Sequence, residues 1–232
     1  MSRFKACIFD VFGTVVDWRS SVARVAKAQF AAKGLDVDAE AFAVFWRGQY
    51  VPAMARIRSG SRGYVALDQL HYENLEASLE EFGLQQHFNA AEKWQFNTAW
   101  EQLDPWPDAV AGLSQLKQQA IIAPCSNGSI ALMTRLAKYG GLPWDCILGA
   151  DIAQNYKPEP EVYLACCQAL RLPEKDVVMV AAHNDDLVAA RETGLQTAFI
   201  ARPREHGDGQ TKDLAPSSDW NYVITDFGQL VP

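Results

Sequence analysis

The chain of 232 residues is longer than a typical single domain, so it can bury a large core and still carry a second, smaller unit. Apolar residues make up 49% of it and charged residues 21%, which excludes a disordered or fibrous protein. The formal net charge of -7, with no cluster of Lys and Arg, argues against nucleic acid as a partner, because phosphate binding needs such clusters.

Residues 6–9 form a short apolar run that stops at Asp10 and Gly13. This is the pattern of a buried parallel strand with a polar residue at its carboxyl end. The segment before Asp10 is too short for a signal-peptide core or a membrane span, so we expect a cytoplasmic protein with no membrane partner. The five cysteines include no C-x-x-C pair, which argues against a disulfide framework and against structural zinc.

Residues 18–103 contain no comparable strand and show the apolar spacing of amphipathic helices. Several such segments, separated by glycine-containing breaks, suit a small helical bundle. We therefore predict a helical cap inserted after the first strand. The predicted helical segments are 22–30, 38–57, 67–82 and 86–100.

From about residue 105 onward, strand-like apolar runs alternate with helical stretches. The alternation predicts an α/β fold with a doubly wound, Rossmann-like parallel sheet. The expected division is an α/β core domain of residues 1–17 and 104–232 and a helical-bundle cap domain of residues 18–103. Residues 202–218, rich in Gly, Pro and charge, are interpreted as a flexible connector in preference to a lid. The later strands are predicted at 121–123, 146–148, 177–180, 197–200 and 222–224.

Polar side chains follow the predicted strands, at the edge where an open parallel sheet binds its ligands. Asp10 follows the first strand, and a carboxylate placed there can act as a covalent nucleophile if nearby cations and amides keep it ionised. Taken alone, an Asp close to a glycine is more often a turn residue. The residues after the later strands favour the nucleophile. They are Ser126, Asn127, Lys157, Pro158, His183, Asn184, Asp185 and Asp186.

Four motifs stand in order along the chain: Asp10-x-Phe12-Gly13-Thr14, Ser126-Asn127, Lys157-Pro158 and the acidic residue Asp186. As a set they resemble the haloacid dehalogenase superfamily over essentially the whole chain. Most of that superfamily are phosphatases, with a second Asp two residues after the nucleophile and an acidic magnesium ligand four positions before the Asp that Asp186 matches. Here these positions hold Phe12 and Ala182, whose side chains can neither transfer a proton nor bind magnesium. The chain instead resembles the (S)-2-haloacid dehalogenase (type II) branch, which implies no metal ion and no cofactor.

The resemblance implies that Asp10 attacks the carbon that carries the halogen, releasing halide and leaving an ester that water hydrolyses. It implies that Lys157 keeps Asp10 ionised. Ser126 and Asn127 would hold the substrate carboxylate, although both are also placed to cap the next helix. Since a halide leaves without a proton, Phe12 suits an apolar wall that excludes water.

In the cap, the segment around Arg47 resembles the one whose arginine faces the leaving halide, with Arg56 and Arg58 as rivals on the same predicted helix. Asp186 matches the Asp that orients or activates the hydrolytic water. His183 stands where familiar members have Asn, and it is either a hydrogen-bond donor to halide or water or a structural residue. The expected catalytic residues are therefore Asp10, Thr14, Arg47, Ser126, Asn127, Lys157, His183, Asn184 and Asp186.

Tyr163 also matches the family, either through its hydroxyl at the edge of the site or through packing alone. The expected substrate contacts are Val11, Phe12, Arg47, Ser126, Asn127 and Tyr163.

The function that the resemblance implies is hydrolytic dehalogenation of small 2-haloalkanoic acids to 2-hydroxy acids, with fluoroacetate as a candidate substrate. The partners would be a small anionic 2-halo acid and halide, and a homodimer is expected from the family. Three alternatives stay open: ring opening of a strained amino acid, an atypical phosphatase, and a binding module that has lost catalysis.

Overall fold

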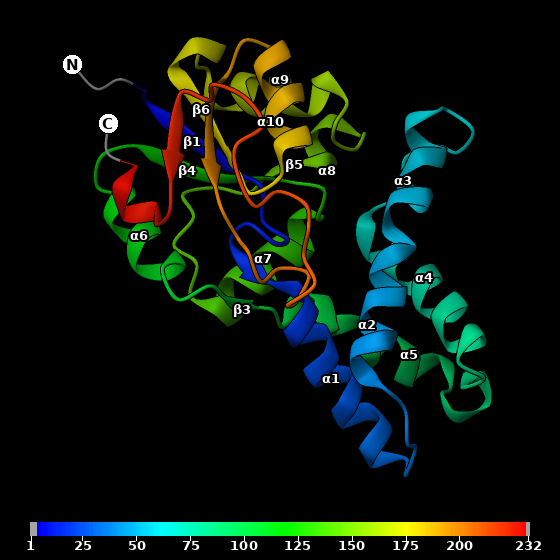
Figure 1. Ribbon diagram of the computed structural model, residues 1–232. Coiled ribbons are helices and arrows are strands. Elements are labelled where there is room, and N and C mark those ends of the chain that lie inside the picture. The colour runs from blue at the N-terminus through cyan, green and yellow to red at the C-terminus, as the bar shows by residue number, and fades with distance from the viewer. Residues whose placement is uncertain (1–3, 231–232) are drawn as a thin grey trace.

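The computed structural model describes residues 4–230, and a six-stranded parallel sheet forms the middle layer of its α/β part (Figure 1). The strand order is β5-β4-β1-β6-β7-β8, so the first strand of the chain sits in the middle. Residues 1–3, part of the segment expected to be too short for a signal peptide, lie outside the described residues. The strands are β1 (Ala6–Phe9), β4 (Ile121–Ser126), β5 (Leu148–Gly149), β6 (Val177–Ala181), β7 (Gln196–Ile200) and β8 (Tyr222–Ile224).

Helices cover both faces of the sheet, which confirms the predicted doubly wound α/β fold. Alternate residues of β1 enter different clusters: Cys7 and Phe9 belong to one, Ala6 and Ile8 to the other. A strand points successive side chains to opposite faces of the sheet, and both faces are covered here. Every residue of β1 is therefore buried and apolar. The helices of this part are α6 (Ala109–Leu116), α7 (Ile130–Gly140), α8 (Ala150–Ala153), α9 (Pro160–Leu170), α10 (Asn184–Glu192), η3 (Glu174–Asp176) and η4 (Phe227–Gln229).

A second group of helices lies to one side of the sheet (Figure 1). The chain enters and leaves this group through a two-stranded antiparallel ribbon, in which Asp17 pairs with Asp104. The side chain of Asp17 also accepts a hydrogen bond from the Ser20 amide and so caps the first helix. The elements are β2 (Val16–Asp17), α1 (Trp18–Ala32), α2 (Ala39–Gly48), α3 (Tyr50–Arg58), α4 (Leu67–Glu81), η1 (Gln85–His87), α5 (Ala90–Asn97), η2 (Thr98–Glu101) and β3 (Asp104–Pro105).

The segment 38–57, expected to be one helix, is two helices that meet at Gln49. Pro52 explains the break, because it has no amide hydrogen to donate to the carbonyl of Gly48 and its ring would collide with that carbonyl in a continuous helix. The strand expected at 146–148 begins two residues later and is short, pairing with β4 only through Leu148 and Gly149. Within residues 4–230, no helix is both long enough and apolar enough to cross a membrane.

Residues 202–218 contain no helix or strand, but the prediction of a flexible connector missed how firmly this segment is held. Arg202 is buried, forms two hydrogen bonds to the Asp108 carboxylate at 2.7 and 3.0 Å, and donates a third to the Thr14 carbonyl. Glu205 is buried as well. Buried charged groups are retained only where they have partners, so the segment belongs to the packed structure.

Candidate active site

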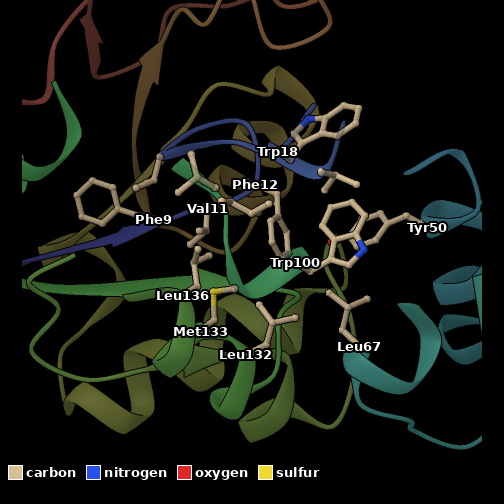
Figure 2. Packing of buried hydrophobic residues seen from close by; sticks show 14 of the residues in the cluster. Phe9, Val11, Phe12, Trp18, Tyr50, Leu67, Trp100, Leu132, Met133 and Leu136 are labelled. Atoms are coloured by element: carbon tan, nitrogen blue, oxygen red, sulfur yellow. The ribbon is translucent and has the colours of Figure 1, made fainter. Parts of the chain in front are cut away.

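The carboxyl ends of β1, β4 and β6 meet under a pocket of about 260 Å³ that is walled on its other side by α2 and α3. Figure 2 shows the buried apolar cluster next to this pocket, where the phenyl ring of Phe12 lies beside Trp100 and close to Tyr50. The residues that line the pocket are Asp10, Phe12, Arg47, Tyr50, Val51, Met54, Arg58, Asn127, Lys157, Pro158, His183, Asp185 and Asp186.

Asp10 lies at the floor of the pocket, immediately after β1, and is only 7% exposed. Its backbone amide donates to the Val180 carbonyl, which extends the pairing of β1 with β6 and fixes the direction of the side chain. Its Oδ1 accepts a hydrogen bond from Lys157 Nζ at 3.0 Å. Its Oδ2 accepts one from Thr14 Oγ1 at 2.7 Å and lies 3.1 Å from His183 Nδ1.

These neighbours keep Asp10 ionised. Burial by itself disfavours the charged carboxylate, but the charge of Lys157 and the hydrogen bond and charge of His183 outweigh it, so the pKa of Asp10 is held below its usual range. Thr14 is fixed in turn, because its hydroxyl accepts a hydrogen bond from the Ala182 amide at 2.9 Å. A buried, ionised and oriented carboxylate is what a covalent nucleophile requires.

Lys157 bridges two carboxylates, with its Nζ 3.0 Å from Asp10 Oδ1 and 2.5 Å from Asp186 Oδ2. Burial disfavours its charge, but the two carboxylates outweigh that effect and raise the pKa of Lys157 above its usual range. The other oxygen of Asp186 accepts a hydrogen bond of 2.5 Å from the Tyr163 hydroxyl. Burial raises the pKa of Asp186 against the opposing charge of Lys157.

His183 lies between two carboxylates, one of which the sequence interpretation missed. Its Nδ1 faces Asp10, and its Nε2 lies 3.1 and 3.0 Å from the two carboxylate oxygens of Glu205. Burial disfavours the imidazolium, but the hydrogen bonds and charges of Asp10 and Glu205 outweigh it and raise the pKa of His183 well above its ordinary value. Glu205 follows β7, so applying the rule about carboxyl ends of strands to that strand as well would have pointed to it.

Two arginines reach the pocket from the helices. The guanidinium carbon of Arg47 lies 3.8 Å from the centroid of the Tyr50 ring, a distance typical of a cation–π contact. Arg58 lines the pocket too, and its Nη1 donates to the Lys157 carbonyl at 3.3 Å. Arg56 is exposed and is not a lining residue, so of the three arginines considered, two are placed to meet an anion.

Several expected site residues do not reach the pocket. The hydroxyl of Ser126 is turned to the Gly128 amide, from which it accepts a hydrogen bond at 3.0 Å. Val11 is buried in the core. Tyr163 does not line the pocket, and its hydroxyl donates a hydrogen bond to Asp186. Asn184 is also turned away.

The side chain of Asn184 holds the segment 202–218 in place. Its Nδ2 donates to Asp213 and to the Ala215 carbonyl, while its Oδ1 accepts from the Ser217 amide and from Trp220 Nε1. Asn127, by contrast, does line the pocket, and its Oδ1 accepts a hydrogen bond of 2.8 Å from the Lys157 amide.

Side chains that could ligate a metal ion are not gathered at this site. Among residues 4–230, no group of three or more His, Cys, Asp or Glu side chains is arranged to hold one. Phe12 presents a phenyl ring beside Asp10, and Ala182 contributes no side-chain oxygen. The site therefore contains a buried carboxylate with cationic and apolar neighbours, a combination that can support nucleophilic chemistry.

Comparison with known proteins agrees with this chemistry. A family model described as a haloacid dehalogenase-like hydrolase matches residues 4–194. The (S)-2-haloacid dehalogenase 4A of Burkholderia cepacia is 30% identical over 219 residues, which cover 93% of this chain and 90% of that protein. Among solved structures, a defluorinating L-2-haloacid dehalogenase has 48% identity and a TM-score of 0.96, covering 98% of this chain and 93% of that one.

A second L-2-haloacid dehalogenase structure has 46% identity and a TM-score of 0.93 and covers 97% of this chain and 95% of that chain. These similarities extend over both the sheet and the helices beside it. The chain therefore belongs to the family of haloacid dehalogenase-like hydrolases.

Proposed function

We propose that this enzyme hydrolyses the carbon–halogen bond of small 2-haloalkanoic acids, giving the 2-hydroxy acid and halide. The observation that carries the proposal is the environment of Asp10: a buried, ionised carboxylate at the floor of a pocket, paired with Lys157 and faced by Phe12 where a proton donor would otherwise stand. The (S)-2-haloacid dehalogenases that resemble the chain over nearly its full length support it.

In the first step, Asp10 displaces the halide. Its Oδ1 is bonded by Lys157 alone among the described residues, whereas its Oδ2 is occupied by both Thr14 and His183. Oδ1 is therefore the better placed nucleophile. It forms a bond to C2 of the acid as the carbon–halogen bond breaks, and the halide leaves with the electron pair towards Arg47, whose charge stabilises it.

In the second step, water hydrolyses the ester on Asp10. The water oxygen attacks Cγ, the negative charge develops on Oδ2, and the donors already directed at Oδ2 from Thr14 and His183 stabilise it. We assign the proton of the water to Asp186, whose raised pKa makes it a better base than an ordinary carboxylate. As the Cγ–Oδ1 bond breaks, Oδ1 takes a proton from Lys157 Nζ, which regains one from Asp186, and the product leaves with Oδ1 as its hydroxyl oxygen. The other proton of the water is released to solvent as the Asp10 carboxylate re-forms.

The substrate carboxylate is assigned to Asn127 on one wall of the pocket and to the cationic side chain of Arg58 on the other. Fluorinated acids belong in the substrate set, because the 48% identical structure is that of a defluorinating enzyme.

We also propose that residues 18–103 act as a cap over the nucleophile. We further propose that the enzyme is a cytoplasmic homodimer, and gel filtration with light scattering tests the dimer.

The experiment that tests the function measures halide released from racemic 2-chloropropionate and from fluoroacetate in the presence of EDTA. The intact protein is compared with Asp10→Asn and with the control Asp185→Asn, which removes an exposed carboxylate at the rim of the same pocket. We expect halide from the intact protein and the control and none above background from Asp10→Asn. No halide from either substrate would contradict the proposal.

The alternatives have their own readouts in the same preparation. Phosphate released from an ester on adding magnesium would indicate a phosphatase, and consumption of a strained-ring amino acid would indicate ring opening. A single turnover in H₂¹⁸O separates the mechanisms, because hydrolysis through Asp10 leaves the label in the protein and not in the product. Label found directly in the 2-hydroxy acid would contradict a covalent intermediate.

A further inference from the structure

Trp18, the first residue of α1, contacts two charged residues of the site. One is Glu205, which faces His183, and the other is Arg47 on α2. The indole of Trp18 is buried, at 2% exposure, and Nε1 donates a hydrogen bond of 3.0 Å to Glu205 Oε1. The face of the same ring lies 5.5 Å from the guanidinium carbon of Arg47. No feature of the proposed chemistry requires an indole here, since Trp18 does not line the pocket.

Glu205 is held tightly where Trp18 meets it. The carboxylate occupies the space next to Gly13, where a Cβ would lie 2.1 Å from Oε1. Gly13 has a φ of +89°, a conformation open to glycine, so the turn after the nucleophile both needs a glycine and leaves room for this carboxylate. The position of the Glu205 carboxylate is thus set by its packing against Gly13 and by its hydrogen bond to Trp18, although Glu205 lies in a loop outside the sequence motifs.

We propose that Trp18 is a positioning residue that links the two halves of the site: its N–H fixes Glu205 and through it the imidazolium of His183 against Asp10 Oδ2, and its ring supports Arg47. This inference rests on the proposed function. The connected path runs from Asp10 to His183, Glu205 and Trp18, and then to Arg47.

The charges around His183 explain why the anchor matters. Asp10 faces Nδ1 from the end of β1, and Glu205 faces Nε2 from the loop after β7. Lys157 and Asp186 lie beyond Asp10, and His206 approaches Glu205 at 3.6 Å from the outer side. During the ester stage Asp10 carries no charge, so Glu205 becomes the carboxylate that keeps the proton on His183 and keeps it directed at Oδ2.

The sign of the pH effect follows. The pKa of His183 is raised by its carboxylates, so the imidazolium is present at neutral pH and is lost as the pH rises through that value. A variant that weakens the contact between Glu205 and His183 lowers the pKa of His183, so the imidazolium is lost at a lower pH. Turnover should therefore fall on the alkaline side, and it should fall earlier when the anchor of Glu205 is removed.

The test compares Trp18→Phe, which keeps a ring but removes the N–H, with Trp18→Leu, which removes both, and with Glu205→Gln. Trp94→Phe, at an exposed indole on α5, is the control. We measure kcat from pH 6 to 10, inhibition by halide product, and the pH titration of the ¹⁵N-labelled imidazole of His183. A charge-assisted hydrogen bond is about twice as strong as a neutral one, so we expect Glu205→Gln to lower kcat at pH 9 by about tenfold.

Trp18→Phe should shift the kcat profile and the His183 titration in the same direction as Glu205→Gln by a smaller amount, with halide inhibition unchanged. Trp18→Leu should in addition weaken halide inhibition. A wild-type His183 titration in Trp18→Phe would overturn the proposal whatever Glu205→Gln does, as would a Trp18→Leu variant with wild-type halide inhibition. Because the imidazole titration needs no substrate, it stays decisive even if the intact protein releases no halide.

Discussion

At the scale of single residues, the site is an alternation of charges: Asp186, Lys157, Asp10, His183 and Glu205, each within hydrogen-bond distance of the next. Removing Lys157 leaves Asp186 without its cation, and removing His183 leaves Glu205 with only the more distant His206. A buried charge that has lost its counterpart costs more than the pair contributes. The arginines differ, because their partners in the reaction would be the anions of the substrate. That difference makes them the cleanest residues for testing how the anion is recognised.

We predict that Arg47→Lys lowers kcat/KM by about 10- to 100-fold, because a hydrogen bond to a charged group contributes about 1.5 to 3 kcal/mol and Lys cannot reproduce the planar contact with Tyr50. The matched control Arg56→Lys, on the exposed side of α3, should change it less than about twofold. Steady-state halide release checks both. If Arg58→Lys loses more than Arg47→Lys, the halide-facing role belongs to Arg58.

At the scale of elements, helix α4 carries a histidine, His71, whose polar ring is buried among apolar side chains. His71 is 1% exposed and stacks on Trp100 with ring centroids 4.2 Å apart. Among the described residues, neither of its ring nitrogens has a hydrogen-bond partner. Burial, with the nearby charge of Arg47, lowers the pKa of His71 well below its ordinary value, so the folded protein holds it neutral.

We predict that His71→Phe stabilises the protein by about 1 to 3 kcal/mol, because an unpaired buried polar group is replaced by an apolar ring of similar shape. The gain should grow as the pH falls below about 6.5, since the unfolded chain then binds a proton that folded His71 refuses. Urea unfolding at pH 5 and 7 measures it, with His87→Phe as the control at a half-buried position. A gain that is absent or independent of pH would contradict the prediction.

At the scale of the whole molecule, the cap proposed for residues 18–103 does not have a core of its own. Phe42 and Phe96 from the helices belong to the same buried cluster as Phe9 and Val180 from the sheet. Phe12, two residues after Asp10, lies where the two parts of this cluster meet, in edge-on contact with Trp100. A shared core couples the stability of the two parts.

We predict that urea unfolds the protein in one transition, with the same midpoint by tryptophan fluorescence and by far-UV circular dichroism. The tryptophans sample both parts, and a separately unfolding cap would divide the two curves. Two midpoints, or cooperative unfolding of an isolated fragment of residues 18–103, would show instead that the cap is an independent domain. The indoles are Trp18, Trp46, Trp94 and Trp100 on the helical side and Trp106, Trp144 and Trp220 on the other.

Most of the architecture could be predicted because it depends on local patterns. The apolar run before Asp10 specifies a strand buried on both faces, and the alternation of strands and helices after residue 105 specifies a doubly wound sheet. The carboxyl ends of such strands share one edge, so Asp10, Lys157, His183 and Asp186 were expected together, and the structure brings them together. The break at Gln49 was missed although Pro52 signals it.

The sequence by itself determined the sheet, the family and the carboxylate that we propose as the nucleophile, because each follows from short-range patterns and from residue types at motif positions. Only the tertiary structure decided which side chains face the pocket. Ser126 and Asn184 turn away to backbone and loop partners, while Glu205 turns in to His183. Such choices depend on which buried donors and acceptors remain to be paired once distant segments have met, and spacing along the chain does not record that.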